Sequence, residues 1–157
     1  MSDRDHSNIQ NYNSMFSAEL IIQNFIKNNP IKYISYSIIV NNKTKFRLYS
    51  CDKWLNFYAE NKLYTKCPLA SSAFKSTSNN IIQWNNLYCR DKEKSEILQS
   101  RRLYNQNYGV TIIVNNKSFT EAFVLSSQCE INYYNIMAKD PIKNLFEDIR
   151  LCTRHLR

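Results

Sequence analysis

Residues 33–50 read Y-I-S-Y-S-I-I-V-N-N-K-T-K-F-R-L-Y-S, and this stretch decides the fold class. Its first eight residues are mostly β-branched or aromatic, and such residues are enriched in strands. N-N-K-T is typical of a turn, because Asn tolerates left-handed backbone angles better than most residues. Residues 45–50 then alternate as in a second strand, so the stretch predicts a β-hairpin.

A second hairpin is predicted near the other end of the chain, where residues 110–114 and 120–127 flank N-N-K-S. Residues 81–84 are interpreted as a short extended segment and residues 71–80 as a loop with one helical turn at most. Hairpins separated by helices predict an α+β fold with a mostly antiparallel sheet covered by helices, as in sensor modules of the PAS and GAF type.

Four helices are predicted around the hairpins from apolar spacing and from their end signals. Residues 1–13 are polar and are expected to be frayed. The helices are residues 15–27, a short helix that Asp52 caps, residues 92–107, and a last helix that starts at Asp140 and Pro141.

Composition predicts one cytoplasmic domain without membrane association. The chain has 157 residues, of which 43% are hydrophobic, and it lacks the run of about 18 apolar residues that a transmembrane helix needs. The N-terminal M-S-D-R-D-H-S-N has no apolar stretch of the kind found in signal peptides. The net charge of +8 is spread along the chain with no helix-turn-helix or RNA-binding signature, so no direct nucleic-acid binding is expected.

Catalysis, metals and cofactors are not expected either. The five cysteines are widely spaced and form no C-x-x-C pair, which argues against a zinc site and a disulfide framework. A single glycine excludes a glycine-rich phosphate loop. The two histidines lie near opposite ends, so no histidine general base is available mid-chain, and we predict a protein that is not an enzyme.

The candidate site begins in residues 54–69, W-L-N-F-Y-A-E-N-K-L-Y-T-K-C-P-L. Trp54 and Tyr58 are four residues apart and share one face of a helix. Each combines an apolar ring with one hydrogen-bond donor, which suits a ligand pocket that has few polar anchors. The same pair would also serve as core aromatics with internal partners, and the residues alone leave both interpretations open.

This part of the chain resembles the N-terminal ligand-binding domain of LuxR-type quorum-sensing regulators, which bind acyl-homoserine lactones. The landmarks of that family follow in its order and at similar spacings: Trp54, Tyr58, Pro68, Trp84 and Gly109. The resemblance implies an α/β/α sandwich, with an autoinducer-binding sensor domain at residues 15–157 after a flexible N-terminus at residues 1–14. It places the ligand between the sheet and the helices of one side.

The resemblance also implies a role for each aromatic residue. Trp54 would donate its indole N–H to the lactone carbonyl, and Tyr58 would line the pocket and bond the amide carbonyl. Trp84 would pack near the lactone ring, and the acyl chain would lie along the face of the sheet.

Three polar anchors of the family differ in this chain. Cys67 stands where the family has an aspartate before the proline, and a thiol is a weak acceptor. A ligand N–H left unpaired in a buried pocket costs about 1–3 kcal/mol. The tyrosine that precedes the tryptophan is Ser50 here, with Tyr49 one place earlier, and the hydroxyl of the later strand falls on Val124, with Ser126 two residues on.

Two hypotheses remain. In the first, the domain senses an acyl-homoserine lactone or a related small amphipathic ligand to regulate transcription, as the retained aromatic residues suggest. In the second, a truncated LuxR-like protein works without ligand and inhibits a full-length regulator by forming a heterodimer. Cys67 favours the second, as does the expected absence of the family's DNA-binding domain.

The last helix carries an apolar stripe that has two possible uses. It would mediate a homodimer or heterodimer, or it would pack on the domain's own sheet. The stripe consists of Ile142, Leu145, Phe146, Ile149, Cys152 and Leu156.

Overall fold

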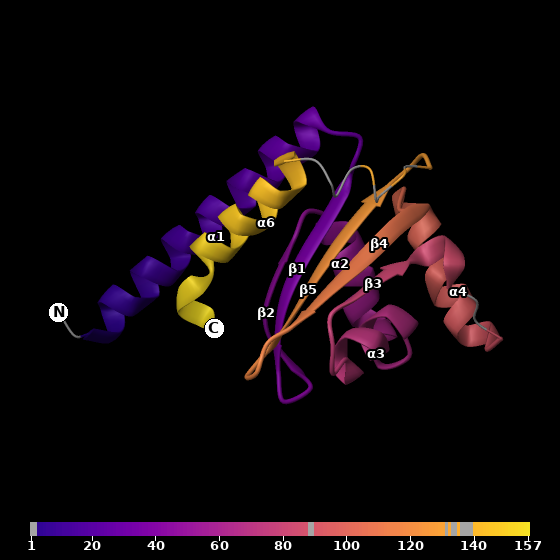
Figure 1. Cartoon of the computed structure of the whole chain (residues 1–157), viewed down its shortest axis with the longest axis horizontal. Helices are drawn as coiled ribbons and strands as arrows, with labels where there is room; N and C mark the ends of the chain where they lie inside the picture. Colours follow the sequence, from indigo (N-terminus) through magenta and orange to yellow (C-terminus); the bar gives the residue numbers. More distant parts are fainter. Residues whose placement is uncertain (1–2, 88–89, 131, 133–134, 136–139) are drawn as a thin grey trace.

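A five-stranded antiparallel sheet forms the centre of the computed structural model, which describes residues 3–87, 90–130, 132, 135 and 140–157, with side chains from residue 14 onward. Its strand order is β2-β1-β5-β4-β3, so β1 and β5 lie inside the sheet and pair along most of their length (Figure 1). The strands are β1 (Tyr33–Val40), β2 (Lys43–Tyr49), β3 (Asn80–Gln83), β4 (Tyr108–Asn115) and β5 (Thr120–Ser127).

Both predicted hairpins are confirmed. β1 pairs with β2 and β4 pairs with β5, each in antiparallel register. Asn41 and Asn42 make the first turn with φ values of 50° and 59°, the left-handed backbone that asparagine tolerates. The N-N sequence at this turn therefore supplies the conformation that glycine provides in most proteins.

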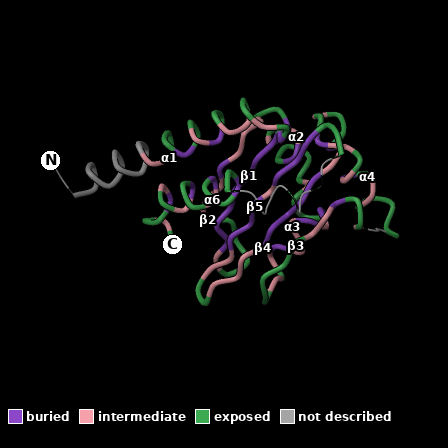
Figure 2. The backbone as a smooth tube through the Cα atoms, turned by 45° about the horizontal axis from the view of Figure 1, so that its top comes forward, coloured by how far each residue is buried: buried purple, intermediate pink, exposed green. Residues whose placement is uncertain are grey.

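Helices cover both faces of the sheet, which confirms the predicted α/β/α arrangement. Helices α1 (Asp3–Asn28) and α6 (Asp140–Cys152) contact each other on one face. Helices α2 (Asp52–Glu60), α3 (Pro68–Lys75) and α4 (Lys92–Ser100) lie on the other side (Figure 1). Figure 2 shows buried residues along the strands and exposed residues on the outer sides of the helices.

The alternation of side chains along β1 divides the interior into two cores. Ile34, Tyr36 and Ile38 are fully buried with residues of α1 and α6. The intervening residues lie on the side of α2 and α3, where Tyr33 and Ile39 belong to two other clusters. A strand that is buried on both faces reads as a continuous apolar and small-residue run, which is the pattern of residues 33–40.

The apolar stripe of α6 packs within the domain. Ile142, Leu145 and Ile149 are each at most 2% exposed and lie in the same core as the sheet and α1. Of the two uses predicted for this stripe, packing on the domain's own sheet is the one observed. Ile142, Leu145 and Ile149 are therefore inaccessible to a partner chain, and dimer formation itself stays a prediction.

Helix α1 begins at Asp3, well before the predicted start at residue 15. The sequence pattern locates a helix by its apolar residues, which begin near Met15. Once a helix has formed its first turns, each further residue adds a hydrogen bond at little cost, so polar residues extend it. The predicted flexibility of residues 1–14 is a separate property and stays a prediction.

Two other boundaries differ from the prediction. The loop assigned to residues 71–80 is wrong for its first half, because α3 spans Pro68–Lys75, with Pro68 at its start. The helix predicted for residues 92–107 ends at Ser100 and continues as a 3₁₀ turn, Arg101–Tyr104. Asn105 stops it with a left-handed backbone, φ 59°.

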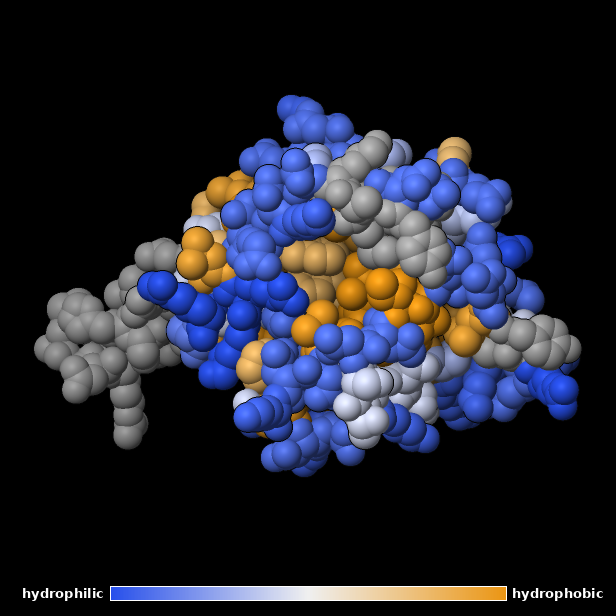
Figure 3. All heavy atoms as spheres, in the orientation of Figure 1, coloured by the Kyte–Doolittle hydropathy of each residue, from blue (hydrophilic) through white to orange (hydrophobic). Residues whose placement is uncertain are grey.

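Apolar residues also reach the surface. Figure 3 shows them gathered in a hollow at the centre of one face, with hydrophilic residues around it. Ile81 of β3 is 43% exposed, and on α1 the exposed residues Met15, Phe16 and Leu20 lie close in sequence. None of the helices among the described residues is long and apolar enough to cross a bilayer.

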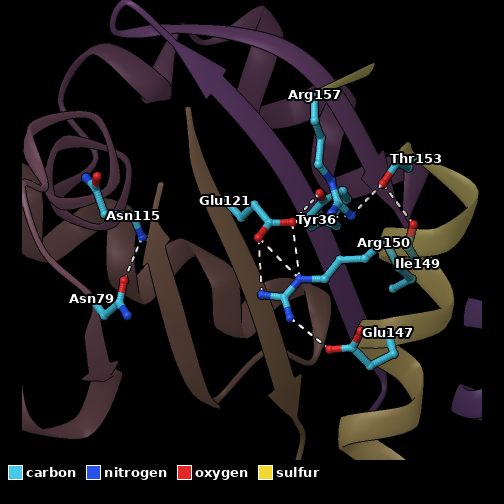
Figure 4. A network of polar contacts seen from close by, with 9 residues as sticks. All are labelled: Tyr36, Asn79, Asn115, Glu121, Glu147, Ile149, Arg150, Thr153 and Arg157. Carbon is cyan, nitrogen blue, oxygen red and sulfur yellow. Dashed lines mark hydrogen bonds and ion pairs between the residues drawn. The ribbon is translucent and has the colours of Figure 1, made fainter. Parts of the chain in front are cut away.

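A buried ion pair joins α6 to the sheet (Figure 4). Glu121 of β5 is 2% exposed, and its carboxylate accepts a hydrogen bond of 2.7 Å from the Tyr36 hydroxyl. Arg150 of α6 pairs with the same carboxylate at 3.1 Å, and Arg157 approaches it at 3.5 Å. Burial, with the hydrogen bond to Glu121 adding to it, raises the pKa of Tyr36 to about 12, so this hydroxyl remains a donor at neutral pH.

We expect Glu121→Gln to lower the free energy of unfolding by about 1.5–3 kcal/mol, because it removes a charged acceptor that several donors share. The matched control is Glu147→Gln. Glu147 pairs with the same Arg150 at 3.1 Å, but its side chain is 72% exposed, so its loss should cost less than about 0.5 kcal/mol. Urea unfolding of both variants checks this, and equal effects would show that the buried pair does not anchor α6.

Candidate ligand-binding site

A cavity of about 70 Å³ lies between the sheet and the helices α2 and α3. On this side of the sheet β1 presents two serines, and β5 presents small residues opposite them, Ser35 facing Val124 and Ser37 facing Ala122. Small side chains on paired strands leave room that the helices above do not fill. The lining residues are Tyr33, Ser35, Ser37, Ile39, Arg47, Trp54, Leu55, Tyr58, Leu69, Ala70, Ala73, Phe74, Arg101, Thr111, Ala122 and Val124.

The two ends of the cavity differ in chemistry. Ile39, Ala73 and Ala122 belong to one apolar cluster at the end of β1 near its turn. Tyr33, at the opposite end of β1, belongs to a cluster rich in aromatic residues. The cavity therefore combines an apolar end with an end that offers ring faces and polar donors, which is the character of a site for an amphipathic small molecule.

Three of the predicted site residues line this cavity: Trp54, Tyr58 and Val124. Trp54 and Tyr58 are the buried residues of α2, and their ring centroids are 5.4 Å apart. Helix α2 presents both on one face because they are four residues apart, and Asp52 in its first turn interacts favourably with the helix dipole. The cap residue itself is Cys51, one place before the predicted Asp52.

Cys67 lies in the same aromatic cluster but does not line the cavity. It is the N-cap residue of α3 and is 1% exposed. Its thiol neighbours the Tyr58 hydroxyl: burial is the main cause that raises the pKa of Tyr58, and Cys67 adds to it, while Arg101 acts in the opposite direction. Tyr58 therefore keeps its hydroxyl proton at neutral pH, and the residue beside it is a cysteine rather than a carboxylate.

Trp84 packs on the only glycine of the chain. A Cβ atom added to Gly109 would lie 2.4 Å from Cε3 of the Trp84 ring, so no side chain fits there. The indole N–H of Trp84 donates to the Thr111 hydroxyl at 3.0 Å, within the protein. Contacts with the sheet thus position Trp84, and its indole N–H is not free to donate to a ligand.

The remaining two predicted residues lie apart from the cavity. Ser126 is fully buried on the same face of the sheet, opposite Tyr33 and Gly109, and its hydroxyl has no hydrogen-bond partner among the described residues. Tyr49 lines a different groove, between α1 and the start of α2. The structure therefore does not bring Tyr49 to the cavity.

A buried arginine stands among the three aromatic residues. Arg101 is 5% exposed, and its guanidinium carbon lies 4.8 Å from the ring centroid of Trp54, 4.6 Å from that of Trp84 and 5.9 Å from that of Tyr58. These are cation–π distances. The guanidinium thus occupies the space between the rings that the resemblance assigned to the head group of a ligand.

The surroundings of Arg101 leave its charge uncompensated. Its Nη1 donates to Oε1 of Gln106 at 3.1 Å, but its Nε is buried without a partner, and no carboxylate of the described residues forms an ion pair with it. Burying an ion costs several kcal/mol, and a desolvated cation–π contact returns about 2 kcal/mol. The rings offset part of the cost, and the remainder favours a negatively charged partner.

Sequence reasoning missed Arg101, although a signal for it existed. Arg101 follows Ile97 by four residues and precedes Tyr104 by three, so it falls on the apolar stripe of the helical segment. A charged residue at such a position is buried among the residues that flank it. In the described part of the chain no group of three or more His, Cys, Asp or Glu residues is placed to hold a metal ion.

No protein-family model and no curated protein sequence matches the chain. Solved structures do match over nearly its whole length. The ligand-binding domain of VqsR from Pseudomonas aeruginosa superposes with a TM-score of 0.59 at 10% identity, covering 94% of this chain and 97% of that one. The fold is that of LuxR-type autoinducer-binding domains.

Two further structures agree. CepR2 from Burkholderia cenocepacia, an N-acylhomoserine lactone dependent LuxR family transcription factor, gives a TM-score of 0.59 at 6% identity, with 96% and 94% of the two chains covered. SdiA in complex with octanoyl-rac-glycerol gives 0.59 at 14% identity, with 99% and 69% covered. At these identities the likeness shows the fold alone, and the prediction that the chain is not an enzyme stays a prediction.

We expect Gly109→Ala to destabilise the protein by about 1–3 kcal/mol, because the new methyl group displaces the Trp84 ring. The control repeats the substitution in a Trp84→Leu background. There the clash is removed and the backbone angle of Gly109 suits alanine, so the added methyl should be neutral or slightly stabilising. Urea unfolding of the four proteins measures the coupling, and additive effects would contradict the packing described here.

Proposed function

We propose that this chain is a sensor domain of the LuxR autoinducer-binding type, which takes a small amphipathic ligand into the cavity between the sheet and helices α2 and α3. The observation that carries the proposal is the cavity itself, in which an apolar end and an aromatic, donor-bearing end lie within one fold of this type. The ligand would alter a regulator of transcription in the cytoplasm.

The neighbours indicate the class of ligand. CepR2 is described as dependent on N-acylhomoserine lactone, and SdiA is bound to octanoyl-rac-glycerol. Both compounds combine an acyl chain with a compact polar head. The apolar end near Ile39 and Ala73 suits the chain, and the end near Trp54 and Tyr58 suits the head. We therefore propose an acyl-homoserine lactone or a related acyl compound.

Ligand entry requires side chains to move. Ligand cavities commonly measure about 300–1,000 Å³, and the present cavity of about 70 Å³ holds only a few water molecules. Arg101 is a long side chain with many rotamers, and it fills the space between the rings. A change of its rotamer is the smallest movement that enlarges the cavity, and such side-chain changes are common when ligands bind.

The small cavity also supports the alternative function. A truncated LuxR-like protein that inhibits a full-length regulator as a heterodimer needs no ligand, and a guanidinium between the aromatic rings suits a domain that is stable without one. Its contact surface would be the exposed apolar residues of α1, namely Met15, Phe16 and Leu20. A homodimer through the same surface is the corresponding proposal for the sensor.

Titration with N-octanoyl-homoserine lactone and with octanoyl-glycerol, followed by calorimetry and tryptophan fluorescence, tests the proposal. We expect saturable binding that Ala73→Leu weakens at least about tenfold, which is about 1.4 kcal/mol, because three added carbons fill the cavity. The matched control is Ala59→Leu on the exposed side of α2, which should leave affinity unchanged.

Two outcomes would contradict the sensor function. Equal weakening by both alanine substitutions would place the ligand outside the cavity. Absence of binding by lactones, glycerides and carboxylates of every chain length, together with a stable complex between the ligand-free chain and a full-length LuxR-type regulator in size-exclusion chromatography, would establish the alternative.

A further inference from the structure

We propose that the ligand carries a carboxylate, and that Arg101 and Arg47 hold this anionic head inside the cavity. The inference rests on the proposed function and specifies its ligand class. An amphipathic carboxylate has two sources: a simple fatty acid, or an N-acyl-homoserine whose lactone ring has been opened by hydrolysis. Both present an acyl chain and one negative charge.

Most hydrogen-bond donors of Arg101 have no partner among the described residues. Its guanidinium has five N–H donors, and among the described residues it makes one hydrogen bond, to Gln106. Its Nε is buried and unpartnered, at a residue that is 5% exposed and lines the cavity. A planar guanidinium with free donors matches a carboxylate, which accepts two parallel N–H bonds from it.

A second cation, Arg47, lines the same cavity. Arg47 of β2 is half-buried and lines it, and its Nε lies 3.3 Å from the Ser37 hydroxyl. Both arginines lower the pKa of the Tyr33 hydroxyl against the stronger effect of burial, so both charges act on one region. Two cations that share a pocket repel each other, and an anion between them removes that repulsion.

The cavity lining contains no acidic residue, among those described, that could neutralise the two arginines. Among the described residues that line the cavity there is no Asp or Glu. The position where the resemblance places an aspartate is Cys67, a buried cysteine beside Tyr58. Position 67 therefore supplies no carboxylate to this part of the interior, which leaves a negative charge to be supplied by the ligand.

The polarity of the cavity changes along β1, from hydroxyl groups at one end to apolar side chains at the other. The hydroxyls of Tyr33, Ser35 and Ser37 line the part near the arginines, and hydroxyls donate hydrogen bonds to a carboxylate. Ile39 lies at the other end, beside Ala73. From Tyr33 to Ile39 the strand rises about 20 Å, which is long enough for a medium-chain acyl compound together with its head. The cavity therefore orders a charged head and an apolar tail.

The decisive experiment uses a ligand pair that differs only by opening of one ring. Calorimetric titration of the unmodified chain compares N-octanoyl-homoserine lactone with the ring-opened N-octanoyl-homoserine. Octanoate and 1-octanol form a second pair with the same tail, and hexanoate and decanoate test the length of the chain. We expect each carboxylate to bind at least about tenfold more tightly than its neutral counterpart, which is about 1.4 kcal/mol.

The two pairs also distinguish the sources of the carboxylate. Tighter binding of the ring-opened compound than of octanoate would identify a lactone hydrolysis product as the ligand, since its amide adds contacts. Tighter binding of octanoate would identify a fatty acid.

Arginine variants then locate the head. Arg101→Met keeps most of the side-chain length and removes the charge, so it should abolish the preference for carboxylates. Arg101→Lys keeps a charge and should retain part of it. The matched control is Arg102→Met, because Arg102 is the next residue and is exposed. If Arg101→Met fails to fold, Arg47→Met provides the same test, and the comparison of ligands on the unmodified chain decides independently.

Three outcomes are distinguishable. Preference for carboxylates that depends on Arg101 supports the inference. Binding of the lactone or of 1-octanol as tight as that of the corresponding carboxylate, or a preference that survives both arginine variants, overturns it and leaves the proposed sensor function intact. Absence of binding by all of these compounds overturns the sensor function, and the inference falls with it.

Discussion

Burial of β1 on both faces is the constraint on which the rest of the structure depends. The strand lies between β2 and β5, and its alternate residues enter two different cores. The side toward α1 and α6 is filled by large residues such as Tyr36 and Ile38, and it is fixed by the buried ion pair of Glu121 with Arg150. Large side chains pack this side of the strand, and the cavity lies on the other side.

The other face of β1 has the opposite character. Ser35 and Ser37 are small, and the aromatic rings of α2 and α3 line the cavity above them without filling it. Arg101 partly fills what remains, and it does so with a charge that the described side chains do not neutralise. One face of the sheet thus stabilises the fold, and the other buries the Arg101 guanidinium, whose desolvation costs free energy. Such unresolved interactions concentrate at functional sites.

The sequence predicted the sheet better than the helices, for a physical reason. Residues 33–40 and 120–127 are long β-rich runs, and N-N pairs mark both turns, so pairing partners could be inferred. Helix ends depend on a few local hydrogen bonds, and the spacing of apolar residues gives no information about them. Pro68 begins a helix here, although the same residue can also end one, and only its cap and neighbours decide which.

The candidate site was predictable to a different degree. Spacing on a helix gave Trp54 and Tyr58 as one face, and both line the cavity. Arg101 was within reach of the same reasoning, because it interrupts an apolar stripe. Arg47 and the two serines were not, since their approach to α2 depends on the register of β1 with β2, which the sequence does not state.

The landmarks that carried the resemblance are residues of packing more than of recognition. Gly109 is required because Trp84 lies on it, and the Trp84 indole bonds Thr111 within the protein. Packing contacts of this kind stabilise the sheet, and the fold is shared with a chain at 10% identity. Chemistry inside the cavity is under no such constraint, so Cys67 can stand where the resemblance placed an aspartate while the sandwich is kept. Fold similarity therefore locates the pocket, and the charges that line it determine what the pocket can hold.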